Sequence, residues 1–405
     1  MRVPFFTPDI SESEIQEVVD CLRSGWLTTG PRTKQFEERF AEYVGAKYAV
    51  ALNSCTAALH LALEAIGIER GDLVLVPTFT FAATAEVVRY FDAIPVFVDA
   101  EPTTLCMDPE ATERCLTALQ RGDKVPGLPS EHGPVKAMIP VHYGGQMVDV
   151  DRFRALAQRF DIALLEDAAH TLPAYCRSNA GAPWRSAGST ADITCFSFYA
   201  NKCITTGEGG MAVTDRQDLA DRMRVMSLHG MSKDAWKRFT ASGSWYYEIV
   251  APGFKYNLTD IAAAIGLKQL ERANALWQER RRVASALSEG LLDVPEIELP
   301  VELSDRQHSW HLFPIRLRLE KLGIDRAAFI EELKAAGIGS SVHWMPLHMH
   351  PYYVDTYGYS AEDFPVAAAA WPRLVSLPIF PLMTAEQCGI VVDVVKDIVR
   401  RHPRR

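Results

Sequence analysis

Two residues in the middle of the chain, an aspartate and a lysine, have the chemistry and the spacing to act on one ligand. Asp167 closely follows the apolar run 162–165, and Lys202 follows a second strand-like run at 193–199. Ligands of open α/β sheets bind outside the carboxyl ends of the strands, where two such side chains can meet. The pair suits pyridoxal phosphate (PLP) catalysis, in which a lysine binds the cofactor aldehyde and a carboxylate keeps the pyridine nitrogen protonated. Taken singly, each has a commoner explanation, because a strand-end aspartate is often a helix N-cap and a loop lysine is usually solvated.

The elements ahead of this pair alternate between strand and helix, which favours a parallel sheet with right-handed crossovers. The first helix, 11–24, begins with the capping-box spacing of Ser11 and Glu14. Further strands are expected at 48–52, 73–77, 95–99 and 135–141, and further helices at 33–45, 57–66, 85–91 and 149–160. Beyond Lys202 we expect helices within 215–232, 261–291 and 325–336, an extended segment at 245–248, and strands at 310–317 and 339–342.

Length and composition limit the class of protein. A chain of 405 residues is too long for a typical single domain, so we expect two. The net charge of -9 argues against broad binding to nucleic acid or to anionic membranes. The eight cysteines form neither a Cys-x-x-Cys pair nor a metal cluster, which indicates free thiols in a reducing compartment. Without a signal-peptide core or a membrane-length apolar run, a soluble cytoplasmic protein is expected, and the basic end 400–405 is interpreted as a frayed terminus.

The segments around the aspartate and the lysine resemble one family. The matching residues are Glu166-Asp167-Ala168-Ala169-His170, Phe196-Ser197-Phe198, Lys202 and the turn Thr-Thr-Gly-Glu-Gly-Gly at 205–210. They are similar to the motifs of the DegT/StrS-type sugar aminotransferases, a branch of the fold-type-I PLP enzymes, and they follow the family's order. The resemblance implies an α/β fold with a mixed, mostly parallel seven-stranded sheet flanked by helices, and a smaller C-terminal α+β domain. We place the large PLP-binding domain at 1–270 and the small domain at 271–405, with the N-terminal helix able to pack on the small domain.

The resemblance also implies roles for single residues. Asp167 is expected to pair with the pyridine nitrogen, and His170 to lie near the phenolic oxygen of the cofactor. Lys202 is expected to be the Schiff-base lysine and the base that moves protons. A branch of the same family has histidine at the lysine position and performs dehydration, so Lys202 favours transamination.

The cofactor phosphate has a candidate site between the strand 48–52 and the helix that follows it. A helix N-terminus offers free N–H groups and a dipole that favour an anion, although an ordinary N-capped helix has the same pattern. By resemblance, the phosphate binds at Ser54, Cys55 and Thr56. Relatives usually have Ser-Gly-Thr there, so Cys55 argues against any contact that needs a glycine backbone angle, whereas amide donation from Cys55 and Thr56 would survive. Ser197 is expected to add a hydroxyl to the phosphate, and Phe81 to lie over the pyridine ring, with core packing as the alternative for Phe81.

Three further sets of residues are assigned by resemblance alone. Lys255 or Asn257 is expected to cross a homodimer interface to the cofactor phosphate of the partner subunit, with the active sites at that interface. Thr28 and Thr29, in a Gly-Trp loop, and His343 are expected to contact the substrate. His348 and His350 lack a third ligand with convincing spacing, so no metal site is expected.

These observations predict a PLP-dependent aminotransferase. It would move an amino group from an amino acid, by family habit L-glutamate, to a nucleotide-linked keto sugar, and the cofactor would alternate between pyridoxal and pyridoxamine 5'-phosphate. The sugar is expected to be a 4-keto-6-deoxy sugar. A PLP-dependent sugar dehydratase or isomerase, a keto-cyclitol aminotransferase and a non-catalytic PLP-binding regulatory protein remain as alternatives.

Overall fold

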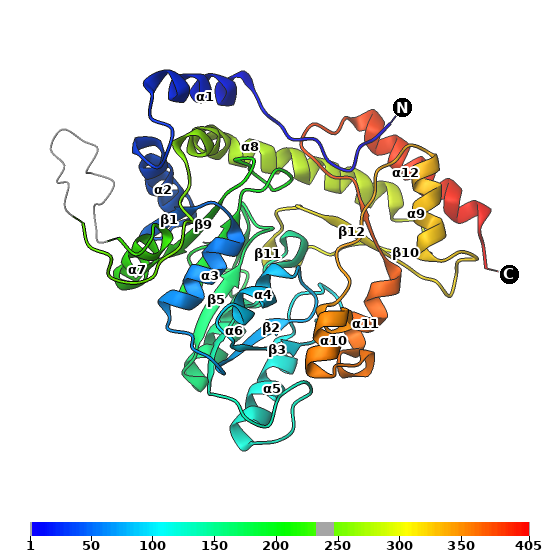
Figure 1. Cartoon of the computed structure of the whole chain (residues 1–405). Coiled ribbons are helices and arrows are strands. Elements are labelled where there is room, and N and C mark those ends of the chain that lie inside the picture. The colour runs from blue at the N-terminus through cyan, green and yellow to red at the C-terminus, as the bar shows by residue number, and fades with distance from the viewer. Residues whose placement is uncertain (1, 232–246, 405) are drawn as a thin grey trace.

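A computed structural model of the chain describes residues 2–231 and 247–404. A seven-stranded sheet with the order β1-β9-β8-β5-β4-β2-β3 forms the centre of its N-terminal part (Figure 1). The strands are β1 (Tyr48–Leu52), β2 (Leu73–Pro77), β3 (Ile94–Val98), β4 (Val135–Met138), β5 (Ala163–Asp167), β8 (Ile193–Ser197) and β9 (Gly210–Thr214). Strand β9 pairs antiparallel with β1 and β8, and the other pairs are parallel. The mixed, mostly parallel sheet predicted from the sequence is confirmed.

Helices connect these strands and flank the sheet (Figure 1). They are α2 (Pro31–Val44), α3 (Cys55–Ala65), α4 (Ala83–Arg89), α5 (Pro109–Arg121), α6 (Val150–Phe160) and α7 (Gln217–Ser227). Since helices flank the sheet, its strands are apolar along their length, and every residue of β2 and β3 is buried. Side-chain caps set the helix starts, as where Asp149 accepts a hydrogen bond from the backbone N–H of Arg152 at the beginning of α6.

The long helix α8 (Asp260–Leu291) joins two hydrophobic cores. Its first half, up to Leu276, packs into the core around the seven-stranded sheet, and its second half, from Val283, packs into a second core. The second core is built on β10 (Ile297–Glu298), β12 (Phe313–Leu317), β13 (Leu374–Leu377), α9 (Arg326–Ala335) and α12 (Ala385–Arg401). A domain boundary at residue 270 stays a prediction.

The C-terminal part of the chain also contacts the N-terminal part again, through a separate small sheet and through the first core. Strand β11 (Arg306–Gln307) pairs with β6 (Tyr175–Cys176), which pairs with β7 (Arg185–Ser186). Helices α10 (Pro351–Tyr357) and α11 (Pro365–Ala370) pack on the first core. Tyr353 of α10 and Phe364, the N-cap of α11, are buried in it. Short 3-10 turns complete the described elements: η1 (Tyr143–Gly145), η3 (Leu347–Met349), η4 (Ala361–Asp363) and η5 (Trp371–Arg373).

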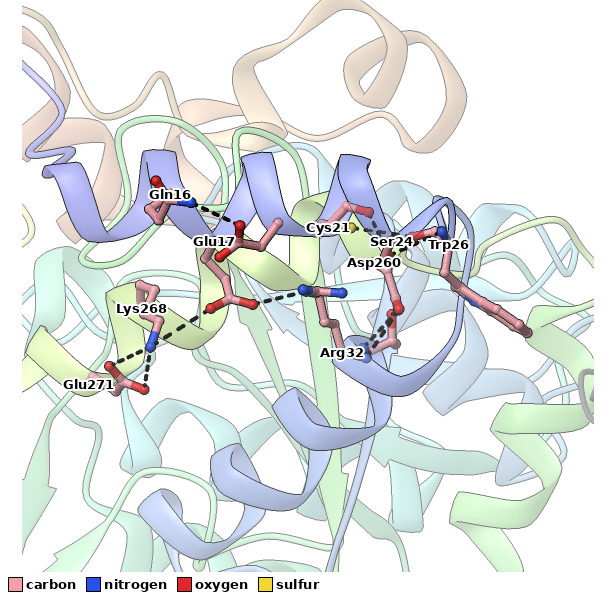
Figure 2. A network of polar contacts seen from close by, with 11 residues as sticks. Gln16, Glu17, Cys21, Ser24, Trp26, Arg32, Asp260, Lys268 and Glu271 are labelled. Atoms are coloured by element: carbon pink, nitrogen blue, oxygen red, sulfur yellow. Dashed lines mark hydrogen bonds and ion pairs between the residues drawn. The ribbon is translucent and has the colours of Figure 1, made fainter.

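The N-terminal helix α1 (Glu12–Ser24) lies along α8 and is held there by charged residues. Figure 2 shows Glu17 of α1 between Arg32 of α2 (2.9 Å) and Lys268 of α8 (3.9 Å). Asp260, the first residue of α8, accepts hydrogen bonds from backbone N–H groups at the start of α2, including that of Gly30 at 2.8 Å. The loop between α1 and α2 is therefore fixed at both of its ends.

Two expectations for the C-terminal part are wrong. Residues 339–342 form no strand, because within this segment Ser341 makes only one isolated bridge, to Ser376. Arg400 and Arg401 are not a frayed tail, since they form the last turn of α12, where basic residues suit the helix dipole. Arg401 also pairs with Glu332 of α9 at 2.8 Å.

Three other predictions concern the cysteines, membrane-spanning helices and the segment 245–248. All eight cysteines are free thiols, as expected. Within residues 2–231 and 247–404, no helix is long and apolar enough to cross a membrane. The first two residues of the extended segment expected at 245–248 lie outside the described residues.

Candidate active site

Asp167 and Lys202 share a cavity of about 380 Å³ at the carboxyl edge of the sheet. Asp167 ends β5, and Lys202 lies in the turn beyond the neighbouring strand β8. The predicted site residues that line this cavity are Ser54, Cys55, Thr56, Phe81, Asp167, His170, Ser197, Lys202 and His343. The structure thus brings together residues that are up to 289 positions apart in the sequence (343 minus 54).

The carboxylate of Asp167 is buried and accepts two hydrogen bonds. Thr84 donates from its hydroxyl at 2.8 Å, and Ala169 donates from its backbone N–H at 3.1 Å. Burial raises the pKa of Asp167, and these two donors together with the Lys202 amine reduce that rise. On its cavity side, this carboxylate would be stabilised further by a positively charged group of a ligand.

Lys202 is half-buried and lines the cavity. Burial lowers the pKa of Lys202, and the negative charge of Asp167 works against that change. A lysine with a lowered pKa is more often neutral at physiological pH, which makes its amine a better nucleophile and proton acceptor.

Backbone groups at the start of α3 form a cradle on one side of the cavity. Ser54 is the N-cap and accepts a hydrogen bond from the N–H of Ala57 at 3.0 Å. Cys55 is the first helical residue, so it needs no glycine backbone angle. The requirement for glycine falls on Gly210 instead, where a Cβ would come within 2.5 Å of the backbone nitrogen of Cys55. Free N–H groups at a helix N-terminus bind phosphate, which is the role the sequence predicts for this turn.

Aromatic side chains form another part of the cavity wall. The ring of Trp344 stacks on that of His170 with 5.0 Å between centroids and 29° between planes. Phe81 lies at the rim, 59% exposed, with its ring 6.1 Å from that of Trp344. Because Phe81 is not packed in the core, its face is available to a planar ligand.

Burial lowers the pKa of the imidazoles of the cavity, which favours their neutral forms. His170 accepts a hydrogen bond at Nδ1 from the backbone N–H of Gly144 (3.1 Å), so its proton is on Nε2. Burial, followed by the positive charge of Lys202, lowers the pKa of His170 well below its usual value. His343 shares a hydrogen bond of 2.8 Å with Ser376, and burial and Lys202 lower its pKa to about 4.

Four of the predicted site residues lie elsewhere. Asn257 and Thr29 line a second cavity of about 450 Å³ and are joined by a hydrogen bond of 2.7 Å. Lys255 is exposed and its amine donates to the Asn257 side chain. Thr28 is exposed on the loop before α2. None of the four lines the Lys202 cavity of this subunit, so their contacts with a partner's cofactor or with substrate stay predictions.

Sequence reasoning missed several residues of the site, among them Trp344, His311 and Thr84. Trp344 directly follows His343, and His311 lies just ahead of β12, so both were within segments that had been singled out. Thr84 contacts Asp167 across 83 positions. Threonines before a helix do not indicate such a distant partner, so Thr84 could be identified only from the structure.

Comparison with known proteins decides the family. Residues 8–396 match the DegT/DnrJ/EryC1/StrS aminotransferase family. The chain belongs to this family. It is 43% identical over 399 residues to the spore coat polysaccharide biosynthesis protein SpsC of Bacillus subtilis, covering 98% of this chain and 97% of that protein.

Solved structures of similar proteins have the same fold. Spr1654 of Streptococcus pneumoniae, assigned as a sugar aminotransferase, has a TM-score of 0.85 at 32% identity, covering 99% of this chain and 98% of that one. It has been solved in PLP and PMP forms. PseC of Helicobacter pylori, an aminotransferase involved in the biosynthesis of pseudoaminic acid, has a TM-score of 0.84 at 25% identity, covering 99% and 100%.

The cofactor of the family is PLP, and the residues of this cavity fit it. The free N–H groups at the start of α3, next to Gly210, suit a phosphate group. The exposed face of Phe81 suits a planar ring. Asp167 offers a buried carboxylate to a pyridine nitrogen, and Lys202 offers an amine to an aldehyde. The chain is accordingly a PLP-dependent aminotransferase of the DegT/DnrJ/EryC1/StrS family.

Proposed function

We propose that the enzyme transfers the amino group of L-glutamate to a keto sugar, and that the sugar is a nucleotide-linked 4-keto-6-deoxy sugar. The observation that carries the proposal is the shared cavity of Lys202 and Asp167, walled by Trp344 and neutral imidazoles. Aromatic faces and neutral hydrogen-bonding groups suit the C–H face and the hydroxyl groups of a sugar. Relatives in spore coat polysaccharide and pseudoaminic acid biosynthesis support a sugar as substrate.

The residues of the chain have separate tasks in this reaction. When bound, PLP supplies the electron sink that lets an amino group move between carbon skeletons. Lys202, whose pKa is lowered by burial, accepts and returns a proton at Nζ. Asp167 would keep the pyridine nitrogen of bound PLP protonated, and Thr84 orients the Asp167 carboxylate. His170 donates from Nε2 without carrying a charge that would repel Lys202.

The assembly and location follow as parts of the same proposal. Two subunits form a homodimer in which Asn257 or Lys255 reaches the cofactor phosphate of the partner subunit, and the enzyme works in the cytoplasm on small molecules. The exposed amine of Lys255 and its link to Asn257 support a shared role for the pair at an interface. The presence of lysine rather than histidine at position 202 favours transamination over dehydration.

The first test is the visible absorption of the purified holoenzyme before and after L-glutamate is added. We expect a band from the lysine-linked cofactor that is lost with L-glutamate. Lys202→Ala removes this band, and Lys268→Ala, a lysine of α8 outside the cavity, leaves it. A band that does not respond to L-glutamate would indicate another donor or a dehydratase. A colourless protein that PLP cannot reconstitute would contradict the proposal.

A further inference from the structure

His311 lies in the active-site cavity but has no task in the proposed reaction. It is only 5% exposed and enters the cavity from the segment ahead of β12. Its ring lies 4.4 Å from the ring of His170, with 44° between the planes. Two imidazoles therefore lie side by side on the wall of the cavity that contains Lys202.

The surroundings of His311 define which nitrogen carries its proton. Its Nδ1 is buried and has no hydrogen-bond partner among the described residues. A proton there would leave a buried donor unpaired, which is more costly than a buried lone pair, so the proton belongs on Nε2. Burial, followed by the neighbouring titratable groups His170 and Lys202, lowers the pKa of His311 well below its usual value, which favours the neutral ring.

The segment that carries His311 is tied to His170 and to the loop below it. Ser309 donates from its hydroxyl to the carbonyl oxygen of His170 at 2.5 Å. Leu312 donates its backbone N–H to the carbonyl oxygen of Gly144 at 3.1 Å, while Gly144 donates its own N–H to Nδ1 of His170. The two imidazoles are thus fixed relative to each other through one small loop.

Two costly features hold the same segment in place. Trp310 has a φ of 55°, in the left-handed region that bulky residues disfavour. Arg280 of α8 is 1% exposed and donates to the carbonyl oxygens of Trp310 (3.3 Å), His311 (3.5 Å) and Ile379 (3.2 Å). Within the described residues Arg280 makes no ion pair. Its buried guanidinium instead donates hydrogen bonds to backbone carbonyl groups. Backbone strain and a buried cation of this kind are typical of functional segments.

We propose that His311 is a substrate-binding residue that donates a hydrogen bond from Nε2 to a carbonyl or hydroxyl oxygen of the keto substrate, beside His170. This inference rests on the proposed function for the identity of that substrate. The carboxylate of an amino-acid donor is matched best by a cation, whereas a pair of neutral N–H groups suits an uncharged oxygen. His311 is therefore expected to act mainly in the half-reaction with the keto substrate.

The first test determines the proton position by NMR of the full-length holoenzyme with ¹⁵N-labelled histidine. The His311 signal is assigned as the one lost in His311→Gln. We expect a neutral ring with its proton on Nε2 between pH 6 and 8 (roughly, the range around the usual histidine pKa). A proton on Nδ1, or a charged ring at neutral pH, would overturn the proposal whatever the substrate is.

The second test compares the two half-reactions in His311→Leu, His311→Gln and a matched control. His311→Leu should raise KM for a nucleotide-linked 4-keto-6-deoxyhexose about tenfold, the effect of losing one hydrogen bond, and change KM for L-glutamate much less. His311→Gln, which keeps a donor, should recover part of the loss. His348→Gln, a buried imidazole outside the cavity that bonds to Thr78, should leave both values unchanged.

Equal effects on both half-reactions would show a merely structural role for His311, and no effect on either would refute substrate binding. If the unmodified enzyme reacts with L-glutamate but with no nucleotide-linked keto sugar, the proposed function fails in its substrate. The proton position measured by NMR then decides the inference about His311 independently.

Discussion

Replacing Thr84 with valine tests whether a single hydroxyl keeps Asp167 ionised. Thr84 donates to Oδ2 of Asp167 at 2.8 Å, and the hydroxyl of Thr80 lies 2.8 Å from that of Thr84. All three side chains are buried, so water cannot replace the lost donor. Valine has nearly the same shape as threonine, and the packing around the site should survive.

The size of the effect follows from the charge on the acceptor. A hydrogen bond to a charged group contributes about 1.5–3 kcal/mol, and one pKa unit corresponds to about 1.4 kcal/mol. The Thr84 hydroxyl stabilises the ionised form, so Thr84→Val raises the pKa of Asp167 by about 1–2 units above its already raised value. Since the ionised carboxylate is needed, activity is lost as the pH falls, and in the variant it is lost at a higher pH.

The assay is the single-turnover rate of the holoenzyme with L-glutamate, followed by absorption across a pH series. The acidic limb of the pH–rate profile should move upward by about 1–2 units in Thr84→Val, and Thr84→Ser, which keeps the hydroxyl, should follow the unmodified enzyme. An unmoved limb in the valine variant, with a folded protein that still binds PLP, would refute the role given to Thr84.

Two further predictions concern the cofactor cradle and the anchor of α1. In Gly210→Ala the added Cβ would clash with the backbone of Ser54, and PLP binding should weaken about 10–100-fold in titrations of the apo-enzyme. Gly389→Ala, with open space around it, should leave PLP binding unchanged. Burial alone would raise the pKa of Glu14, but donors that include Arg272 outweigh it and lower the pKa to about 2. Its stabilising effect is therefore complete above pH 4.5 and is lost as the pH falls toward 2. Glu14→Gln should reduce the free energy of unfolding by about 2–3 kcal/mol at pH 7, and the difference in Tm should vanish in acid; a pH-independent difference would contradict this.

Features that depend on neighbours in sequence could be predicted from the sequence. Strands β1 and β2 begin and end at the expected residues, because an apolar run between turn-forming residues is a local signal. The capping box of Ser11 and Glu14 was recognised for the same reason. Asp167 and Lys202 were found because each follows a strand, and strand ends on one side of a parallel sheet meet in space.

Features that depend on distant partners could not be predicted. Gly210 was taken as part of a turn, yet it begins β9, which is fixed by pairing with both β1 and β8. The positions of Thr84 and His311 in the site are set by packing across the fold, and a single sequence carries no record of those contacts. The strand expected at 339–342 is the converse error, since within this segment Ser341 makes only one isolated bridge, to Ser376, and the cross-strand pairing that a strand needs is missing.

The two consecutive acidic residues at the end of β5 show how the fold separates structure from chemistry. Successive side chains of a strand point to opposite faces, so Glu166 and Asp167 meet different surroundings. Burial would raise the pKa of Glu166, but His142, 3.4 Å away, and the hydroxyls of Thr190 and Thr194 outweigh it and lower the pKa. Asp167 has fewer donors, so burial prevails and its pKa is raised. The first carboxylate is satisfied by the protein itself, whereas the second gains its missing positive partner only from a ligand in the cavity, which is the property a pyridine-binding carboxylate needs.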